Sequence, residues 1–169
     1  PRSRRSARAK ISFNVSGLTE TSTLTLNSGV VCNGAGDNTN YIFCIPEDIT
    51  VPVTNGFAEF NNIEIYEGVF ISENFTVDTS LFNQRYILDN SFIDTSTIKV
   101  KVKSSSTATS SVTYKQIDNI VGVTSTSNSY LLQEIEDERY ELIFGDNVIG
   151  RKFLNNNYIT VSYIVTEGK

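Results

Sequence analysis

The stretch that decides the fold is RYELIFGDNVIGRKFLNNNYITVSYIVTEG, which runs from Arg139 to Gly168. Tyr140, Leu142 and Phe144 lie at alternate positions, which is the period of a strand with two different faces. Glycine, aspartate and asparagine follow, and these residues favour a tight turn. Beyond a second, asparagine-rich turn, Tyr158 to Val165 is almost entirely β-branched and aromatic. The stretch therefore predicts a strand, a turn and a second strand.

The rest of the chain has the same short alternating segments, separated by glycine, asparagine and aspartate. Asn55-Gly56 is a strong signal for a two-residue hairpin, and Glu136 to Glu138 is expected to join another pair of strands. No segment shows the 3.6-residue period of a helix over three turns. The sequence therefore predicts an all-β fold of mostly antiparallel strands and hairpins, with little or no helix.

The composition of the sequence changes after Val77, which suggests two small β lobes. We expect an N-terminal lobe over residues 9–73 and a C-terminal lobe over residues 74–169, the latter carrying the FGDNVIG turn. The pattern leaves open whether the last strand returns to the first lobe. Residues 1–8 are interpreted as a basic linker or a cut end.

Charge is distributed unevenly along the chain. The first ten residues contain Arg2, Arg4, Arg5, Arg8 and Lys10 and no acid. The remainder holds nine of the 14 basic residues and all 19 acidic residues, so its net charge is −10. An acidic body repels the phosphate backbone, which argues against nucleic acid as a partner.

A lysine alternation marks the segment from Thr97 to Val102. We expect Ile98, Val100 and Val102 to face the core, and the lysines at positions 99, 101 and 103 to form a solvated face. Alternating lysine is typical of strands that avoid pairing with another chain, especially at a sheet edge. A role for these lysines in binding nucleic acid is the less favoured interpretation.

Little in the sequence points to catalysis or to a cofactor. The chain has no histidine, and its two cysteines, Cys32 and Cys44, flank a polar turn. Two cysteines without histidine do not make a zinc site of the usual four-ligand kind, and we expect both thiols to be free. No apolar run approaches the roughly 20 residues that a membrane span requires. The sequence thus predicts no catalytic site, no metal, no cofactor, no small-molecule substrate and no membrane.

The motif after the penultimate strand is predicted to be a structural turn made by Phe144, Gly145, Asp146, Asn147 and Gly150. Asp146 together with Glu138 or Glu141 could imitate a catalytic carboxylate pair or a calcium site. An aspartate that follows glycine at a strand end is more often a turn former, and we favour that interpretation.

The segment FGDNVIGRKF, followed by YITVSYIV, resembles the baseplate J family of phage proteins, and more closely its wedge subunits in T4-like contractile-tailed phages. Three further segments fit in the same order: IEIYEGVFISENFTV (Ile63–Val77), DTSTIKVKV (Asp94–Val102) and YLLQE (Tyr130–Glu134). The resemblance covers about Ile63 to Gly168. One departure is Asn147, where the family pattern has glycine; asparagine is the next-best residue for a left-handed position.

The resemblance implies an internal fragment of a baseplate wedge protein, since the chain opens on proline and lacks methionine. Such a protein would act through assembly with other wedge subunits and not through chemistry, and contacts between its own copies stay open. Its place would be the tail baseplate of the virion, assembled in the host cytoplasm. The alternative is an adhesion or carbohydrate-binding β module of a surface or tail-fibre protein, and a carboxylate-only glycosidase is a weaker third possibility.

Overall fold

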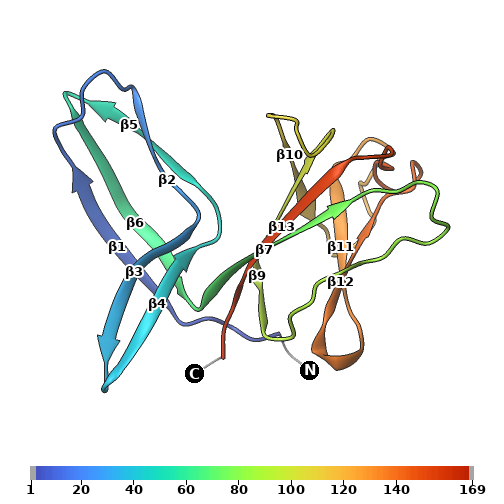
Figure 1. Ribbon diagram of the computed structural model, residues 1–169, viewed down its shortest axis with the longest axis horizontal. Coiled ribbons are helices and arrows are strands. Elements are labelled where there is room, and N and C mark those ends of the chain that lie inside the picture. Colours follow the sequence, from blue (N-terminus) through green and yellow to red (C-terminus); the bar gives the residue numbers. More distant parts are fainter. Residues whose placement is uncertain (1–2, 168–169) are drawn as a thin grey trace.

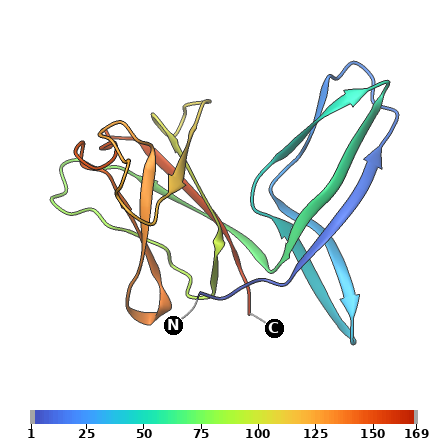
Figure 2. The ribbon, with the colours of Figure 1, turned by 180° about the vertical axis from the view of Figure 1, so that it is seen from behind.

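The computed structural model describes residues 3–167, which form two β-sheets that diverge from a common junction (Figures 1 and 2). The chain is all-β, as the sequence predicts. The helical content of the described residues is the single 3₁₀ turn η1 (Glu136–Glu138). This turn connects two antiparallel strands, which confirms the hairpin predicted there.

The first sheet contains six strands and makes the N-terminal lobe. They are β1 (Arg8–Val15), β2 (Thr23–Leu26), β3 (Gly29–Gly36), β4 (Thr39–Ile45), β5 (Ile49–Thr54) and β6 (Phe57–Glu67). The long strand β6 organises this sheet because it pairs with β1, β4 and β5, all antiparallel. Asn55 (φ 52°) and Gly56 (φ 73°) are both left-handed between β5 and β6. This is the two-residue hairpin that the Asn-Gly pair predicts.

The second sheet contains seven strands and makes the C-terminal lobe. They are β7 (Val69–Thr76), β8 (Tyr86–Ile87), β9 (Ile93–Lys103), β10 (Val112–Gln116), β11 (Ser129–Glu134), β12 (Tyr140–Phe144) and β13 (Tyr158–Val165). Their spatial order is β7-β13-β9-β10-β11-β12-β8. Every pairing in this sheet is antiparallel except the short one between β10 and β11.

The second sheet curls into a nearly closed barrel around the larger of the two cores. Ile159, Val161 and Tyr163 of β13 are fully buried there, against Val100 of β9. Ile98 and Val102 are also buried while Lys101 is exposed, so the predicted alternation of β9 is confirmed. However, β9 lies between β13 and β10 and is not a sheet edge.

Side chains, not a backbone ladder, close the barrel between its edge strands β7 and β8. The Gln84 amide donates to the Thr76 carbonyl oxygen at 2.8 Å, and its oxygen accepts the Asp78 N–H at 2.9 Å. The Glu73 carboxylate accepts the Asp89 N–H at 3.1 Å and the hydroxyl of Tyr163. A charge pointing inward from an edge strand discourages pairing with another chain, so Glu73 both closes the barrel and protects its edge.

The chain passes from one sheet to the other at Gly68. All of β7 belongs to the second sheet, whereas the boundary predicted after Glu73 falls inside that strand. The sequence could not place the change, because β6 and β7 have similar compositions on either side of the glycine. The last strand, β13, pairs with β7 and β9 and so stays in the second sheet.

Gly68 is required where it stands for two reasons. Its φ of +140° is one that L side chains rarely adopt, and an added Cβ would lie 2.4 Å from the Val165 carbonyl oxygen. Its N–H also donates to Ile42 O at 3.0 Å, and the Cys44 thiol donates to its carbonyl oxygen at 3.3 Å. The backbones of β4, β6 and β13 therefore meet at this one residue.

We expect Gly68→Ala to destabilise the protein by about 2–4 kcal/mol, from backbone strain together with the steric overlap at Val165. Urea denaturation followed by circular dichroism measures the effect. Gly17→Ala is the matched control, since Gly17 is also left-handed (φ +73°) but has no atom within 4 Å of the added Cβ. It should cost only about 1 kcal/mol. Equal losses for the two variants would show that contact at the junction is unimportant.

Candidate functional site

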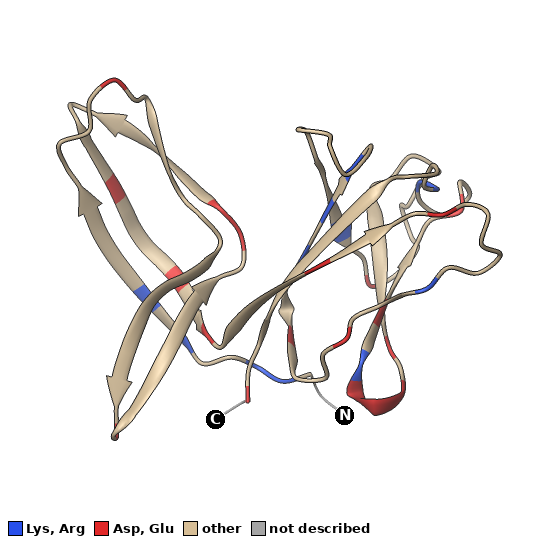
Figure 3. Ribbon diagram, viewed as in Figure 1, with Lys and Arg blue, Asp and Glu red and all other residues tan. Residues whose placement is uncertain are grey.

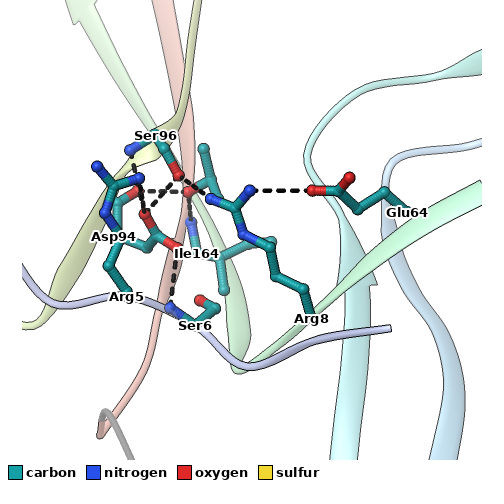
Figure 4. A network of polar contacts seen from close by, with 8 residues as sticks. Arg5, Ser6, Arg8, Glu64, Asp94, Ser96 and Ile164 are labelled. Carbon is teal, nitrogen blue, oxygen red and sulfur yellow. Dashed lines mark hydrogen bonds and ion pairs between the residues drawn. The ribbon is translucent and has the colours of Figure 1, made fainter. Parts of the chain in front are cut away.

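The N-terminal segment spans the junction between the two sheets (Figure 4). It lies against the start of β9 and then becomes β1, which pairs with β6 along its whole length. The carbonyl oxygen of Ala7 accepts the N–H of Glu67 at 2.8 Å, close to the point where the sheets separate. One short segment thus contacts both lobes.

Asp94 is the centre of this junction. Its side chain is fully buried, and one carboxylate oxygen accepts the Ser6 N–H at 2.9 Å. The other oxygen accepts the N–H of Ser96 at 3.1 Å and its hydroxyl at 2.6 Å. Arg5 adds a cation 4.0 Å away. A buried carboxylate is tolerated only when donors surround it, and here a donor on the N-terminal segment is part of that set.

The sequence Asp94-Thr95-Ser96-Thr97 folds as an irregularity in β9. The register against β13 shifts between Ser162 and Ile164. Within this irregularity, the Thr97 hydroxyl donates to the carbonyl oxygen of Asp94 at 2.7 Å and accepts the N–H of Ile164 at 2.9 Å. Short hydroxyl side chains thus replace ladder bonds, and the displaced backbone directs Asp94 toward the N-terminal segment.

Two arginines hold the segment to both lobes. Arg8 donates to Glu64 of the first sheet at 3.0 Å and to the Ser96 hydroxyl of the second at 2.9 Å. Its guanidinium also lies 4.9 Å from the Tyr66 ring centroid. Arg4 lies 4.1 Å from the Phe92 ring centroid and donates to the carbonyl oxygen of Glu167. We call residues 4–8, with these contacts, the strap.

The sequence suggested a basic linker or a cut end for residues 1–8 and did not indicate whether it is ordered. In the structure Arg4, Arg5 and Arg8 have partners on folded strands. Arg2 lies outside the described residues. The signal that sequence reasoning missed is the Asp-x-Ser pattern at Asp94, which predicts a local turn that orients the carboxylate. This pattern does not indicate which distant segment the carboxylate contacts.

Two further contacts tie the lobes together beside the strap. The Thr166 hydroxyl donates to the carboxylate of Glu67 at 2.8 Å, and Lys99 lies 3.4 Å from Glu47. Cys44, at the end of β4, is fully buried, and this burial raises the pKa of its thiol. Both Cys44 and the half-buried Cys32 are free in the structure.

The segment after β12 has the geometry of a tight structural turn. The Asp146 carboxylate accepts the N–H groups of Val148 and Ile149, each at 2.9 Å. These bonds hold the pKa of Asp146 below its usual range. Asn147 is left-handed (φ 73°), its N–H donates to Gly150 O at 3.0 Å, and its side chain accepts the Lys152 N–H at 3.0 Å. Asparagine thus serves where glycine was expected.

The two glycines of the turn are needed for different reasons. Gly150 is left-handed (φ +86°), whereas an added Cβ on Gly145 would lie 2.1 Å from the carbonyl carbon of Gly150. Phe144 enters the core just before them, where its ring lies 4.6 Å from Phe153 and 5.3 Å from Tyr86 between centroids. The turn therefore attaches a compact loop to the aromatic core of the second sheet.

The alternative roles weighed for the acidic residues find no support in the geometry. Glu141 is engaged by Arg85 in a two-point bond at 2.8 and 2.7 Å, which lowers the pKa of the carboxyl. Glu138 belongs to η1, beyond the other end of β12. In residues 3–167, no three side chains among His, Cys, Asp and Glu are grouped so that they could hold a metal ion. Likewise, no helix in this part is long and apolar enough to cross a membrane.

Neither a protein-family model nor a curated protein sequence matches the chain. The resemblance to the baseplate J family therefore stays a hypothesis based on the motifs.

We expect Asp94→Ala to destabilise the protein by about 2–4 kcal/mol, because it removes a charged acceptor and leaves the Ser6 N–H and the Ser96 donors unpaired. Hydrogen exchange should also accelerate at the Ser6 amide and at the β1–β6 amides beside it. Urea denaturation and exchange mass spectrometry measure the two effects.

Asp78→Ala is the matched control for this variant. Asp78 accepts the N–H of Ser80 at 2.9 Å and its hydroxyl at 2.6 Å, the same local arrangement, but on an exposed loop. Asp78→Ala should lower stability much less than Asp94→Ala and should leave hydrogen exchange at the Ser6 amide unchanged. If the two variants behaved alike, the strap would not depend on Asp94.

In the turn, Gly145→Ala should destabilise the protein by about 2–4 kcal/mol through overlap with the Gly150 backbone.

Asp146→Asn should destabilise the protein less than Gly145→Ala, and its effect on stability should depend on pH. The folded-state pKa of Asp146 is depressed, so its contribution is fully present above the ordinary value near 3.9 and is lost as pH falls through the folded-state value. The stability difference between wild type and Asp146→Asn should therefore stay constant above about pH 5 and shrink as the pH falls below about 4 in urea titrations. A stability difference that does not change with pH would show that the charge of the Asp146 carboxylate does not stabilise the turn.

Proposed function

We propose that the chain is a structural part of a phage tail baseplate wedge, acting through protein–protein assembly and not through catalysis. Its partners are other wedge subunits, and its place is the virion, assembled in the host cytoplasm. The motifs described above suggest the family. The observation that carries an assembly role is an exposed apolar surface around the turn after β12.

This surface, here called the apolar patch, consists of Leu81, Phe82, Ile120, Ile143 and Ile149. Phe82 is completely exposed, Leu81 and Ile120 are about half exposed (55% and 52%), and Ile143 and Ile149 are each 40% exposed. Contiguous exposed apolar surface on a soluble protein marks sites of interaction. Burying a side chain such as Phe82 in an interface contributes about 1.5–3 kcal/mol.

The patch borders two open grooves that share the segment from Ile143 to Asp146. One groove, of about 750 Å³, is lined by Leu81 and Phe82, and the other, of about 220 Å³, by Ile120 and Ile149. The hydrogen bonds of Asp146 and Asn147 fix the loop between them. A surface that is rigid before binding loses less conformational entropy on association, which suits a permanent structural contact.

The carbohydrate-binding alternative requires aromatic side chains on an outer face. All eight tyrosines lie in the described part of the chain, and every one of them is buried or half-buried. Tyr140 is only 8% exposed and Phe144 packs on the core, as their phase in the sequence predicts. Most aromatic side chains are therefore buried or half-buried; the exposed ones are phenylalanines, namely Phe57 (39%), Phe92 (41%) and the Phe82 of the apolar patch.

The double variant Phe82→Ser/Ile143→Ser should weaken co-assembly of the full-length protein with neighbouring tail proteins by at least about tenfold, because it removes two central apolar contacts. Size-exclusion chromatography and sedimentation of the co-expressed proteins measure this. Circular dichroism should be unchanged, since both side chains are exposed.

Val30→Ser is the matched control, because Val30 is 65% exposed on β3 of the other sheet. It should assemble like the wild type. Unimpaired assembly of the double variant would contradict the role of the patch. A glycan array with micromolar binding would favour the adhesin instead.

A further inference from the structure

A second surface with a different chemistry lies on the outer face of β9 and β10. Lys101 and Lys103 extend from β9 on the face opposite the core, and Lys115 extends from β10, where Thr113 pairs directly with Lys101. Within the described part of the chain, none of the three lysines has a carboxylate within 4.0 Å, whereas Lys99 reaches Glu47. Figure 3 shows the basic residues on these strands, and acidic residues spread over both lobes with one cluster at the η1 turn.

This row of lysines continues into a small groove. The groove has a volume of about 210 Å³, and Lys103, Arg151 and Lys152 line it together with Asn128 and Asn157 and no acidic residue. Val112 and Leu154, which are 49% and 73% exposed, also line it. We call Lys101, Lys103, Lys115, Arg151 and Lys152 the basic face.

The basic residues differ in whether they have partners within the protein. The arginines of the strap and Arg85 have acidic or aromatic partners on folded strands. Among the described residues, the three lysines and Arg151 form no ion pair within 4.0 Å although the chain carries 19 acidic residues, whereas the charge of Lys152 helps to lower the pKa of Asp146. Five cations on one face repel one another, so a bound anionic group would relieve this repulsion as well as attract each of them.

We propose that the basic face binds an extended, acidic segment of a partner protein. Alternate residues of β9 lie about 6.8 Å apart, and alternate side chains of an extended peptide have the same spacing. Carboxylates at every second position of such a segment match Lys101 and Lys103, and a flanking apolar side chain fits between Val112 and Leu154. Lys101, Lys103 and Lys115 line neither groove of the apolar patch, although Lys152 borders both surfaces, so the proposal does not depend on the assembly role.

A protein segment fits this face better than nucleic acid does. Single-stranded nucleic acids bind to positively charged grooves that also present aromatic side chains for base stacking. On this face Tyr114 is buried and Tyr158 is half-buried, while the exposed large side chains are aliphatic. The chain as a whole has a net charge of −5, which opposes the approach of a long phosphate backbone.

The test uses a fluorescein-labelled peptide with four Glu-Thr repeats followed by leucine, titrated with the intact chain. Fluorescence anisotropy should show binding at about 50 mM NaCl that weakens at about 300 mM, because the contacts are ionic. Lys101→Glu/Lys103→Glu should reduce the affinity at least tenfold, and Lys101→Arg/Lys103→Arg should retain it. Circular dichroism checks that the variants fold, and Lys115→Glu provides an independent substitution on β10.

Lys10→Glu is the matched control, since Lys10 is an exposed lysine on β1 of the first sheet; it should bind the peptide like the wild type. A labelled oligothymidylate of similar charge is titrated in parallel. Tighter binding of the oligonucleotide than of the peptide would overturn the proposal, as would an absence of peptide binding at low salt. Peptide binding that survives the double Glu variant would overturn it as well.

Discussion

The buried carboxylate of Asp94 is the interaction on which the arrangement of the two sheets depends. A carboxylate removed from water is costly unless donors surround it, and Asp94 has them from Ser96 and from the Ser6 N–H. The Ser96 donors are local, so they are present whenever β9 is formed. The Ser6 donor arrives only when the strap docks. Because β1 begins at Arg8, docking of the strap also determines where the first sheet lies.

The sheets are joined at two points, and this is why their relative orientation is defined. If the backbone at Gly68 were the only connection, one sheet could rotate relative to the other about it. The strap is a second connection, which returns from Asp94 to β6 through the Ala7–Glu67 bond at 2.8 Å. Both connections reach the same end of β6, so rotation at the junction would break the Arg8–Ser96, Thr166–Glu67 and Lys99–Glu47 contacts together. Individually, exposed ion pairs contribute little; their effect here comes from acting with the buried carboxylate.

The local structure could be predicted from the sequence because short-range preferences determine it. Two-residue alternation placed β12, and β-branched and aromatic content placed β13. Asn55-Gly56 specified a hairpin, and the turn chemistry of Asp146 and Asn147 follows from their own side chains. The junction could not be predicted in this way. Ser6 and Asp94 are 88 positions apart, and no alternation or turn rule relates them. The change of sheet at Gly68 depends on its closeness to Val165, which is again a non-local fact.

The two proposed surfaces follow from the same property of a strand, which is that one face cannot be buried without exposing the other. On β12, burial of Leu142 and Phe144 against the aromatic core leaves Ile143 on the outside. On β9, burial of Val100 and Val102 leaves Lys101 and Lys103 outside. The outward side chains do not pack in the core, so they can be apolar on β12 and basic on β9. Apolar side chains on a rigid loop increase the affinity for a partner, whereas unpaired lysines orient an acidic partner and increase its association rate. A lobe with both can attach one partner firmly while it selects another by charge, next to the Lys99–Glu47 contact where the first sheet borders the basic face.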